Sequence, residues 1–354
     1  MVGLRPWTIF LGGLVLAGIF QMFVASAFGD PAAMLQVGES SSVAPFIKSE
    51  LGDDIPIFPD FGHDGQAAYV IARQPFGGEA GDALGAPAFR YRRWLYPALG
   101  GGMGTLSPRA TIVGLAVWSA IGFGLAAAAL VVIGETYGVR SRLLALAVYL
   151  NVGLILSTVI STPDSLGLGL SLAGVAAYRK DRRSLAVLLL AAAVLTKEQF
   201  LIFAIAVAID AWIGGQRRAA LNYLLVPVGV LAVVSLIVVS AFGGSGGLGS
   251  NVTAPFFGIV EASHDWSSAY VVSRRASYVS LFGLAAIAPL ALWSRQRLII
   301  LMSAGWFAGA VLGGEVVWRK GTDSLRVFAA LWPLMALAAA VAVREHRRRP
   351  TGEN

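Results

Sequence analysis

The chain has no cysteine among its 354 residues, so neither a disulfide bond nor a thiolate metal site can form. Histidine is nearly as scarce. Its three copies, His63, His264 and His346, lie far apart in the sequence, which argues against a histidine-rich zinc site. Charged residues make up only 13% of the chain, compared with roughly 25% in soluble domains. These shortages exclude disulfide-stapled scaffolds and ordinary soluble enzymes.

Apolar residues are abundant instead, at 56% of the chain, and the mean hydropathy is +0.71. The sequence therefore predicts an all-α polytopic membrane protein. With roughly 20 apolar residues needed per crossing, we expect about ten transmembrane helices. The apolar stretches are 7–28, 110–134, 143–161, 164–178, 184–196, 199–214, 219–242, 276–294, 298–317 and 325–343.

Three of these stretches are short, namely 164–178, 184–196 and 199–214. The middle one reaches only about 20 Å at 1.5 Å per residue, less than the roughly 30 Å hydrocarbon thickness. Short, interrupted helices in a bundle tend to border a cavity. The alternative is a single long span over 184–214.

The distribution of charge favours ten spans with both termini inside. In that arrangement the cytoplasmic segments hold 15 of the 27 basic residues and only five of the 20 acidic ones. The fused span would move Arg217 and Arg218 outside and invert everything after them, against the positive-inside rule. The basic inner face also explains the pI of about 9.9 through anionic lipid headgroups, so no nucleic-acid partner is predicted.

We expect a single polytopic domain over 1–343, followed by a basic cytoplasmic tail over 344–354. Ala25-Ser26-Ala27 resembles a signal-peptide cleavage site. However, the preceding apolar run of 22 residues exceeds the usual 7–15, so a retained helix is predicted. Residues 243–275 are rich in glycine and predict a flexible extracytoplasmic loop.

The first extracytoplasmic loop, residues 29–109, is the longest connection. Loops beyond about 15 residues are uncommon unless they are functional. Residues 64–73 and 90–99 have helical character, with aromatic and arginine side chains suited to the membrane interface. We therefore expect interfacial helices in this loop.

Basic residues accompany carboxylates in the segments assigned to the outer side, although the charge rule disfavours them there. Arginine binds phosphate through its planar fork, so an anionic partner is predicted. The alternative for the whole set is ordinary solvated loop charge. Asp164 also fits a helix cap, and Lys197–Glu198 a structural ion pair. The set is Asp64, Arg90, Arg92, Arg93, Asp164, Lys197, Glu198, Arg274, Arg275, Arg319, Lys320 and Arg326.

Several motifs resemble the polytopic GT-C glycosyltransferases, and in particular bacterial membrane proteins linked to cell-surface glycopolymer formation. The first loop carries the specific ones: Asp64-Gly65-Gln66, Ile71-Ala72, Pro75-Phe76 and the run Tyr91–Pro97. Thr162–Ser165 and Leu195–Glu198 are similar as well, so the resemblance spans most of the chain. His63 stands where a tyrosine is common in that family.

The resemblance implies a sugar transfer on the outer face of the cell membrane, from a polyprenyl-phosphate donor to a glycan or glycolipid acceptor. Asp64 would be the general base. The donor phosphate would be held by Arg92, Arg93, Lys197 and Arg326, and the acceptor or its surroundings by His63, Gln66, Asp164 and Glu198. Independently of the family, such a transfer needs one carboxylate for the acceptor proton and positive charge for the leaving phosphate.

Two other functions stay open from the sequence. Broken helices near charges are also typical of a transporter or flippase for a lipid-linked or anionic solute. A non-catalytic assembly factor would show a shallow outer face. No cofactor is firmly implied, although a divalent cation held by Asp60, Asp64 and Asp164 is left open.

Overall fold

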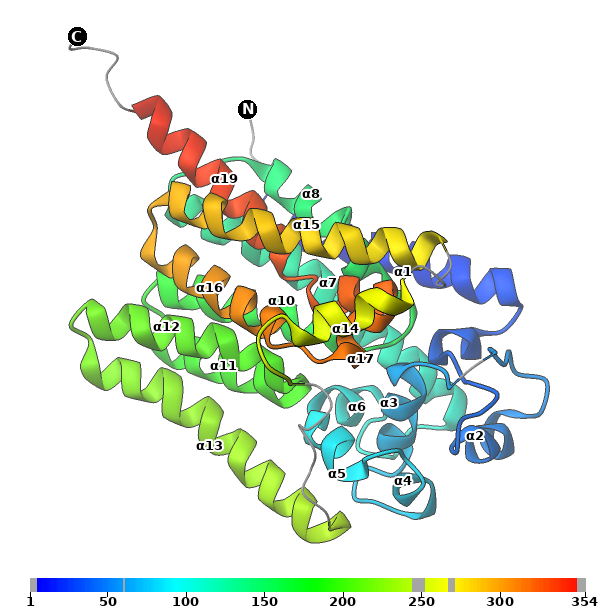
Figure 1. Cartoon of the computed structure of the whole chain (residues 1–354). Coiled ribbons are helices and arrows are strands. Elements are labelled where there is room, and N and C mark those ends of the chain that lie inside the picture. Colours follow the sequence, from blue (N-terminus) through cyan, green and yellow to red (C-terminus); the bar gives the residue numbers. More distant parts are fainter. Residues whose placement is uncertain (1–4, 60, 244–251, 267–270, 349–354) are drawn as a thin grey trace.

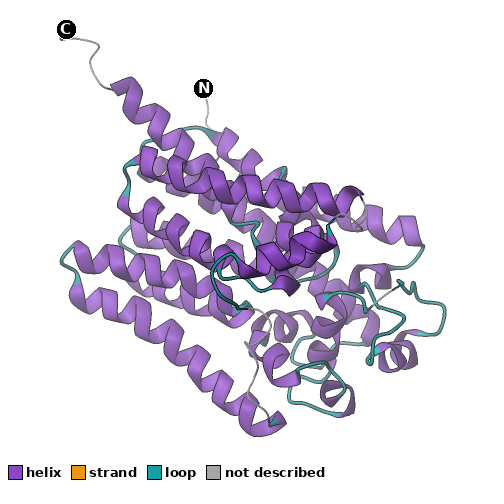
Figure 2. Cartoon of the chain, viewed as in Figure 1, coloured by secondary structure: helices purple, strands orange, loops and turns teal. Residues whose placement is uncertain are grey.

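The computed structural model describes residues 5–59, 61–243, 252–266 and 271–348. Asp60 and the glycine-rich stretch 244–249 therefore lie outside the described residues. Within the described ranges the fold is all-helical (Figure 2), which confirms the predicted class. No strand occurs there, and three isolated bridges are the only β-type pairings described.

The bundle is built from helices that overlap the predicted apolar stretches, although 143–161, 298–317 and 325–343 are each divided between two or more helical segments. Four are long and apolar enough to cross a membrane, α1, α7, α13 and α15, or up to six when each of two bent pairs is taken as one span. The prediction of ten crossings is thus supported only as a membrane protein with several spans. The helices are α1 (Pro6–Phe28), α7 (Pro108–Thr136), α8 (Leu146–Tyr149), α9 (Val152–Val159), α10 (Asp164–Arg179), α11 (Arg183–Thr196), α12 (Leu201–Ile213), α13 (Arg217–Phe242), α15 (Val271–Ser294), α16 (Arg297–Val311), α18 (Gly321–Val327) and α19 (Leu331–Arg348).

The first loop folds as a compact cap with its own hydrophobic core. It contains η1 (Pro31–Leu35), α2 (Ala44–Leu51), α3 (Asp64–Arg73), α4 (Glu79–Asp82), α5 (Pro87–Arg90), η2 (Tyr91–Arg93) and α6 (Leu95–Gly100). Leu35, Ile47, Tyr69 and Tyr96 are fully buried there, and the cap packs on Ile112 and Leu115 of α7. The helix expected over 90–99 is divided among α5, η2 and α6.

The loop expected over 243–275 is partly helical. Within its described part, α14 (Phe257–Asp265) forms a separate helix, and α15 begins at Val271, not near 276. Arg274 and Arg275 therefore lie within a helix. Another short helix, α17 (Glu315–Arg319), packs against α14 and precedes α18.

Close packing of α10 against α7 positions the start of α10. A Cβ atom at Gly169 of α10 would lie 2.4 Å from the Gly122 carbonyl oxygen of α7. Small residues at such crossings let two backbones approach in a membrane bundle. This contact fixes α10 and its first residue, Asp164, beside α7.

Two helical pairs are bent at short breaks. The segment η3 (Arg142–Ala145) with α8 meets α9 at 57°, and α18 meets α19 at 51°. Figure 1 shows α2–α6 gathered at one end of the bundle, while the α12–α13 and α15–α16 turns and the last turn of α19 lie at the other. The two ends thus differ, one carrying the cap and the other the basic turns.

Candidate functional site

Eight charged side chains from separate parts of the chain meet beside the cap, and we call them the ion-pair cluster. Four are acidic and four are basic, so their formal charges cancel. The cluster consists of Asp64, Asp164, Glu198, Asp323, Arg90, Arg93, Lys197 and Arg326.

Asp64 is the centre of the cluster. Its Oδ1 lies 3.2 Å from Arg90 Nη1, and its Oδ2 lies 3.0 Å from Arg326 Nη2 and 3.8 Å from Arg93 Nη1. Asp64 and Arg326 are 262 positions apart in the sequence. One carboxylate therefore ties the first loop to the C-terminal part of the bundle.

The backbone around Asp64 explains its position. Asp64 is the first residue of α3, where the helix dipole favours a negative charge. A Cβ atom at the next residue, Gly65, would lie 2.4 Å from the Ile160 carbonyl oxygen. Only glycine allows this approach, which brings Asp64 next to the turn that precedes α10.

Asp164 is the second carboxylate and is more deeply buried. Its side chain is 2% exposed, and its Oδ1 lies 2.5 Å from Lys197 Nζ, whose side chain is 4% exposed. Thr162 Oγ1 donates a 3.1 Å hydrogen bond to Oδ2. Lys197 lies at an extended break between α11 and the 3₁₀ turn η4 (Glu198–Phe200). A pair this buried needs both partners, because either charge alone would be strongly unfavourable.

Arg326 links the two carboxylates. Its Nη2 contacts Asp64 as described, its Nε lies 3.6 Å from Asp164 Oδ2, and Nη2 is also 3.4 Å from Asp323 Oδ1. The side chain is only 7% exposed, yet neither its Nε nor its Nη1 has a hydrogen-bond partner. Buried donors are nearly always paired. Nη1 is thus a buried donor that lacks a partner.

Arg93 and Glu198 form a bidentate pair at the edge of the cluster. Arg93 Nε and Nη2 donate to the two Glu198 oxygens at 3.1 and 2.8 Å. The guanidinium carbon of Arg93 also lies 4.5 Å from the centre of the Phe89 ring. This geometry is directional and holds Arg93 with its remaining nitrogen toward Asp64.

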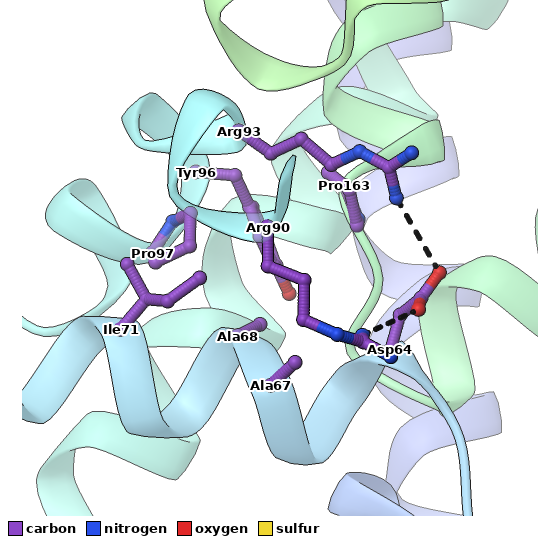
Figure 3. Close-up of a pocket in the computed structure, with 9 residues that line it drawn as sticks. All are labelled: Asp64, Ala67, Ala68, Ile71, Arg90, Arg93, Tyr96, Pro97 and Pro163. Atoms are coloured by element: carbon purple, nitrogen blue, oxygen red, sulfur yellow. Dashed lines mark hydrogen bonds and ion pairs between the residues drawn. The ribbon is translucent and has the colours of Figure 1, made fainter. Parts of the chain in front are cut away.

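A cleft opens beside Asp64. It is small, with a cavity volume of about 20 Å³, and Ala67, Ala68, Ile71 and Tyr96 provide much of its apolar lining. Figure 3 shows Arg90 and Arg93 approaching Asp64 from two sides of this cleft, with Pro163 behind. The cleft thus has charged side chains at the end near Asp64 and apolar side chains along its wall.

The charges around Asp64 set its protonation. Burial alone would raise its pKa, but the cations Arg326, Arg90, Arg93 and Lys197 outweigh that effect and hold the pKa well below its usual range. Asp64 is therefore an anion at any ordinary pH. A carboxylate with so low a pKa is a weak general base until some of that positive charge is directed elsewhere.

The predicted site residues divide into two groups. Asp64, Asp164, Lys197, Glu198, Arg93 and Arg326 come together in the cluster, and His63 Nδ1 lies 3.7 Å from Asp323 Oδ1 at its rim. Gln66 instead holds the cap loop, donating to the Phe61 carbonyl and accepting from the Gly38 amide. Arg92 forms no ion pair within the described ranges, and its buried Nε is unpartnered.

Three members of the site were not among the predicted site residues. Arg90 belonged only to the wider set of outer charges, and Asp323 and Gln199 were not singled out. Asp323 precedes Arg326 by three residues, the spacing at which helical side chains meet, so this signal was present in the sequence. Gln199 Nε2 lies 3.5 Å from Asp164 Oδ1, a contact that the break after α11 produces.

No group of three or more acidic or histidine side chains is placed to hold a metal ion in the described part of the chain. Asp64 and Asp164 both face the Arg326 guanidinium, and Asp60 is not described.

Comparison of the sequence and fold with protein-family models, curated proteins and solved structures gives no match.

Proposed function

We propose that the protein is an integral-membrane glycosyltransferase that moves a sugar from a polyprenyl-phosphate donor to a glycan or glycolipid acceptor on the extracytoplasmic face of the cell membrane. The observation that carries the proposal is the buried Arg326 guanidinium, which contacts both Asp64 and Asp164 and has two nitrogens, Nε and Nη1, without a hydrogen-bond partner. A site that pairs a carboxylate with spare guanidinium donors suits an acid–base step beside a phosphate.

In the proposed reaction the acceptor hydroxyl oxygen attacks the anomeric carbon of the sugar. The attack comes from the face opposite the phosphate and the bond between that carbon and the phosphate oxygen breaks in the same step, so transfer proceeds with inversion. The hydroxyl proton goes to Asp64, and the polyprenyl phosphate leaves with the bonding electrons. Arg326, Arg93 and Lys197 would stabilise the charge that develops on the departing phosphate.

The low pKa of Asp64 gives donor binding a second role. A phosphate that engages Arg326 and Arg90 would draw their charge away from the Asp64 carboxylate. The basicity of Asp64 would then rise only when the donor is in place. The resting ion-pair cluster would thus keep the base inactive until a substrate arrives.

The test uses purified protein in proteoliposomes with mannosyl and glucosyl esters of polyprenyl phosphate, and follows release of polyprenyl phosphate in the presence of a membrane glycolipid extract. Asp64→Asn should lower the rate by about 10²–10⁴-fold, the usual contribution of a general base. Asp53→Asn, at an exposed position of the same cap, should transfer normally. Near-normal transfer by folded Asp64→Asn protein would remove the proposed base.

A transporter of a lipid-linked or anionic solute is the second candidate, because two bent helical pairs pack together near the cluster. The same proteoliposomes distinguish the two functions. A transporter would move a fluorescent polyprenyl-phosphate sugar between leaflets without cleaving it. Concentration of the cluster beside the cap, and not along the full length of the bundle, favours transfer over transport.

A further inference from the structure

A long groove runs along the outside of the bundle between α11 and α13. Its volume is about 830 Å³. The wall is apolar along most of its length, with Val187, Leu188, Ala191 and Val226 among the lining residues. Figure 1 shows α13 lying beside α11 at the edge of the bundle, and only 11% of its most apolar 18-residue window is buried. The groove therefore faces the lipid in a membrane.

One end of the groove is basic. Arg183 at the start of α11 and Arg218 at the start of α13 both line it, and both side chains are exposed. Neither forms an ion pair within the described ranges, whereas the neighbouring Arg217 stacks on Trp212. Ser184 and Asn222 line the same end and add neutral hydrogen-bonding groups.

This basic end is separate from the ion-pair cluster. Arg183 and Lys197 lie just inside and just beyond the two ends of α11, about 20 Å apart at 1.5 Å per residue. The groove thus combines two unpaired guanidinium groups at one bundle end with an apolar channel leading toward the other. A diacyl lipid whose anionic headgroup lies at that membrane surface has the same distribution of charge and apolar length.

We propose that the groove between α11 and α13 is a binding site for an anionic phospholipid. Arg183 and Arg218 would bind the headgroup phosphate, and an acyl chain would lie along Val187, Leu188 and Val226. Arginine forks suit a phosphate diester, and cationic residues near a membrane surface favour anionic over zwitterionic lipids. The proposal does not depend on the proposed transferase activity.

Native mass spectrometry of the purified full chain tests the proposal, with phosphatidylglycerol and phosphatidylcholine added at equal concentration. We expect the wild-type protein to bind phosphatidylglycerol more tightly. Arg183→Ala/Arg218→Ala should lose most of that preference, by about fivefold for each arginine, the factor that corresponds to roughly 1 kcal/mol per charge. Arg347→Ala/Arg348→Ala, which removes two charges from the last turn of α19, is the matched control and should retain it.

A second variant tests the channel without touching the charges. Ala192→Phe places a large side chain in the groove and should reduce binding of both lipids while leaving the headgroup preference intact. Equal losses from the two arginine pairs would show general surface attraction and overturn the proposal. Competition by polyprenyl phosphate gives a second outcome that would overturn the proposal. If polyprenyl phosphate displaced the phospholipid, and if Arg92→Ala abolished this displacement while Arg183→Ala/Arg218→Ala did not, the groove would hold the donor chain.

Discussion

The side-chain amide of Asn151 donates a 2.7 Å hydrogen bond to the backbone carbonyl of Ala329. Each residue lies at the break of a bent helical pair, the first before α9 and the second after α18. Asn151 also caps α9 by accepting from the Leu154 amide. One buried side chain thus satisfies backbone groups at both breaks.

Replacing Asn151 with alanine should therefore weaken the fold. The substitution leaves the buried Ala329 carbonyl and the first turn of α9 without their partner, at a cost of about 1–3 kcal/mol. The measurement is the thermal unfolding midpoint in detergent. Asn222→Ala, at an exposed position of α13, is the control and should change little. Equal midpoints for the two variants would contradict the proposed link between the breaks.

Packing of α9 against α18 also depends on Gly153. A Cβ atom there would lie 2.0 Å from the Leu325 carbonyl oxygen, next to Arg326. Gly153→Ala should thus separate the two helices, lower the unfolding midpoint and displace Arg326. Gly18→Ala, where a Cβ atom meets nothing within 4 Å, should be neutral or slightly stabilising. A stable Gly153→Ala protein with unchanged polyprenyl-phosphate release would disprove this packing argument.

The Lys197–Asp164 pair predicts a large loss on removal of one partner. Lys197→Met leaves a buried carboxylate with less compensation, and we expect a cost of about 3–5 kcal/mol. Asp164→Asn combined with Lys197→Met removes both charges and should recover part of that loss. Lys48→Met, at a half-buried lysine of the cap, serves as the single-charge control. If the double variant were less stable than Lys197→Met, the pair would not be the source of the effect.

The depressed pKa of Asp64 predicts a specific pH dependence. Its ion pairs contribute stability above the unfolded-state pKa of about 3.9, and this contribution is lost as pH falls below that value toward the lower folded-state pKa. The difference in unfolding midpoint between wild-type protein and Asp64→Asn should be constant from about pH 8 to 5 and shrink below about pH 4. A difference that already shrinks near pH 6 would mean that the cations do not hold Asp64 ionised.

Membrane orientation can be tested directly because the natural chain has no cysteine. Ser42→Cys lies in the cap, and Lys180→Cys lies between α10 and α11 at an exposed position. In intact cells a membrane-impermeant maleimide should label the first and spare the second until the membrane is opened. The reverse pattern would place the ion-pair cluster on the cytoplasmic side.

Much of the architecture could be predicted from the sequence because long apolar runs have few alternatives to helices in a bilayer. The breaks were harder to predict. The stretch 325–343 reads as one apolar segment, yet α18 ends at Val327 and α19 begins at Leu331. Such a break depends on a contact between residues far apart in the sequence, as between Asn151 and Ala329. No local sequence pattern predicts that contact.

In the site, too, the sequence predicts individual residues but not the long-range contacts between them. Asp64 and Arg326 could be proposed because both belong to the charges assigned to the outer side and the family resemblance implies roles for them. Their pairing could not be proposed, since 262 positions separate them and the fold of the cap sets the distance. Arg92 is predicted from its neighbours in a motif, but it forms no ion pair within the described ranges and its buried Nε lacks a partner.

Because the ion-pair cluster already contains as many acids as bases, the resting pocket supplies its own counterions. An arriving phosphate would compete with Asp64 for guanidinium groups, because the acids of the cluster already balance its positive charge. Binding would then be an exchange of one anion for another, with little net change in charge pairing. Affinity for such a ligand should consequently depend only weakly on ionic strength, unlike that of an open basic patch.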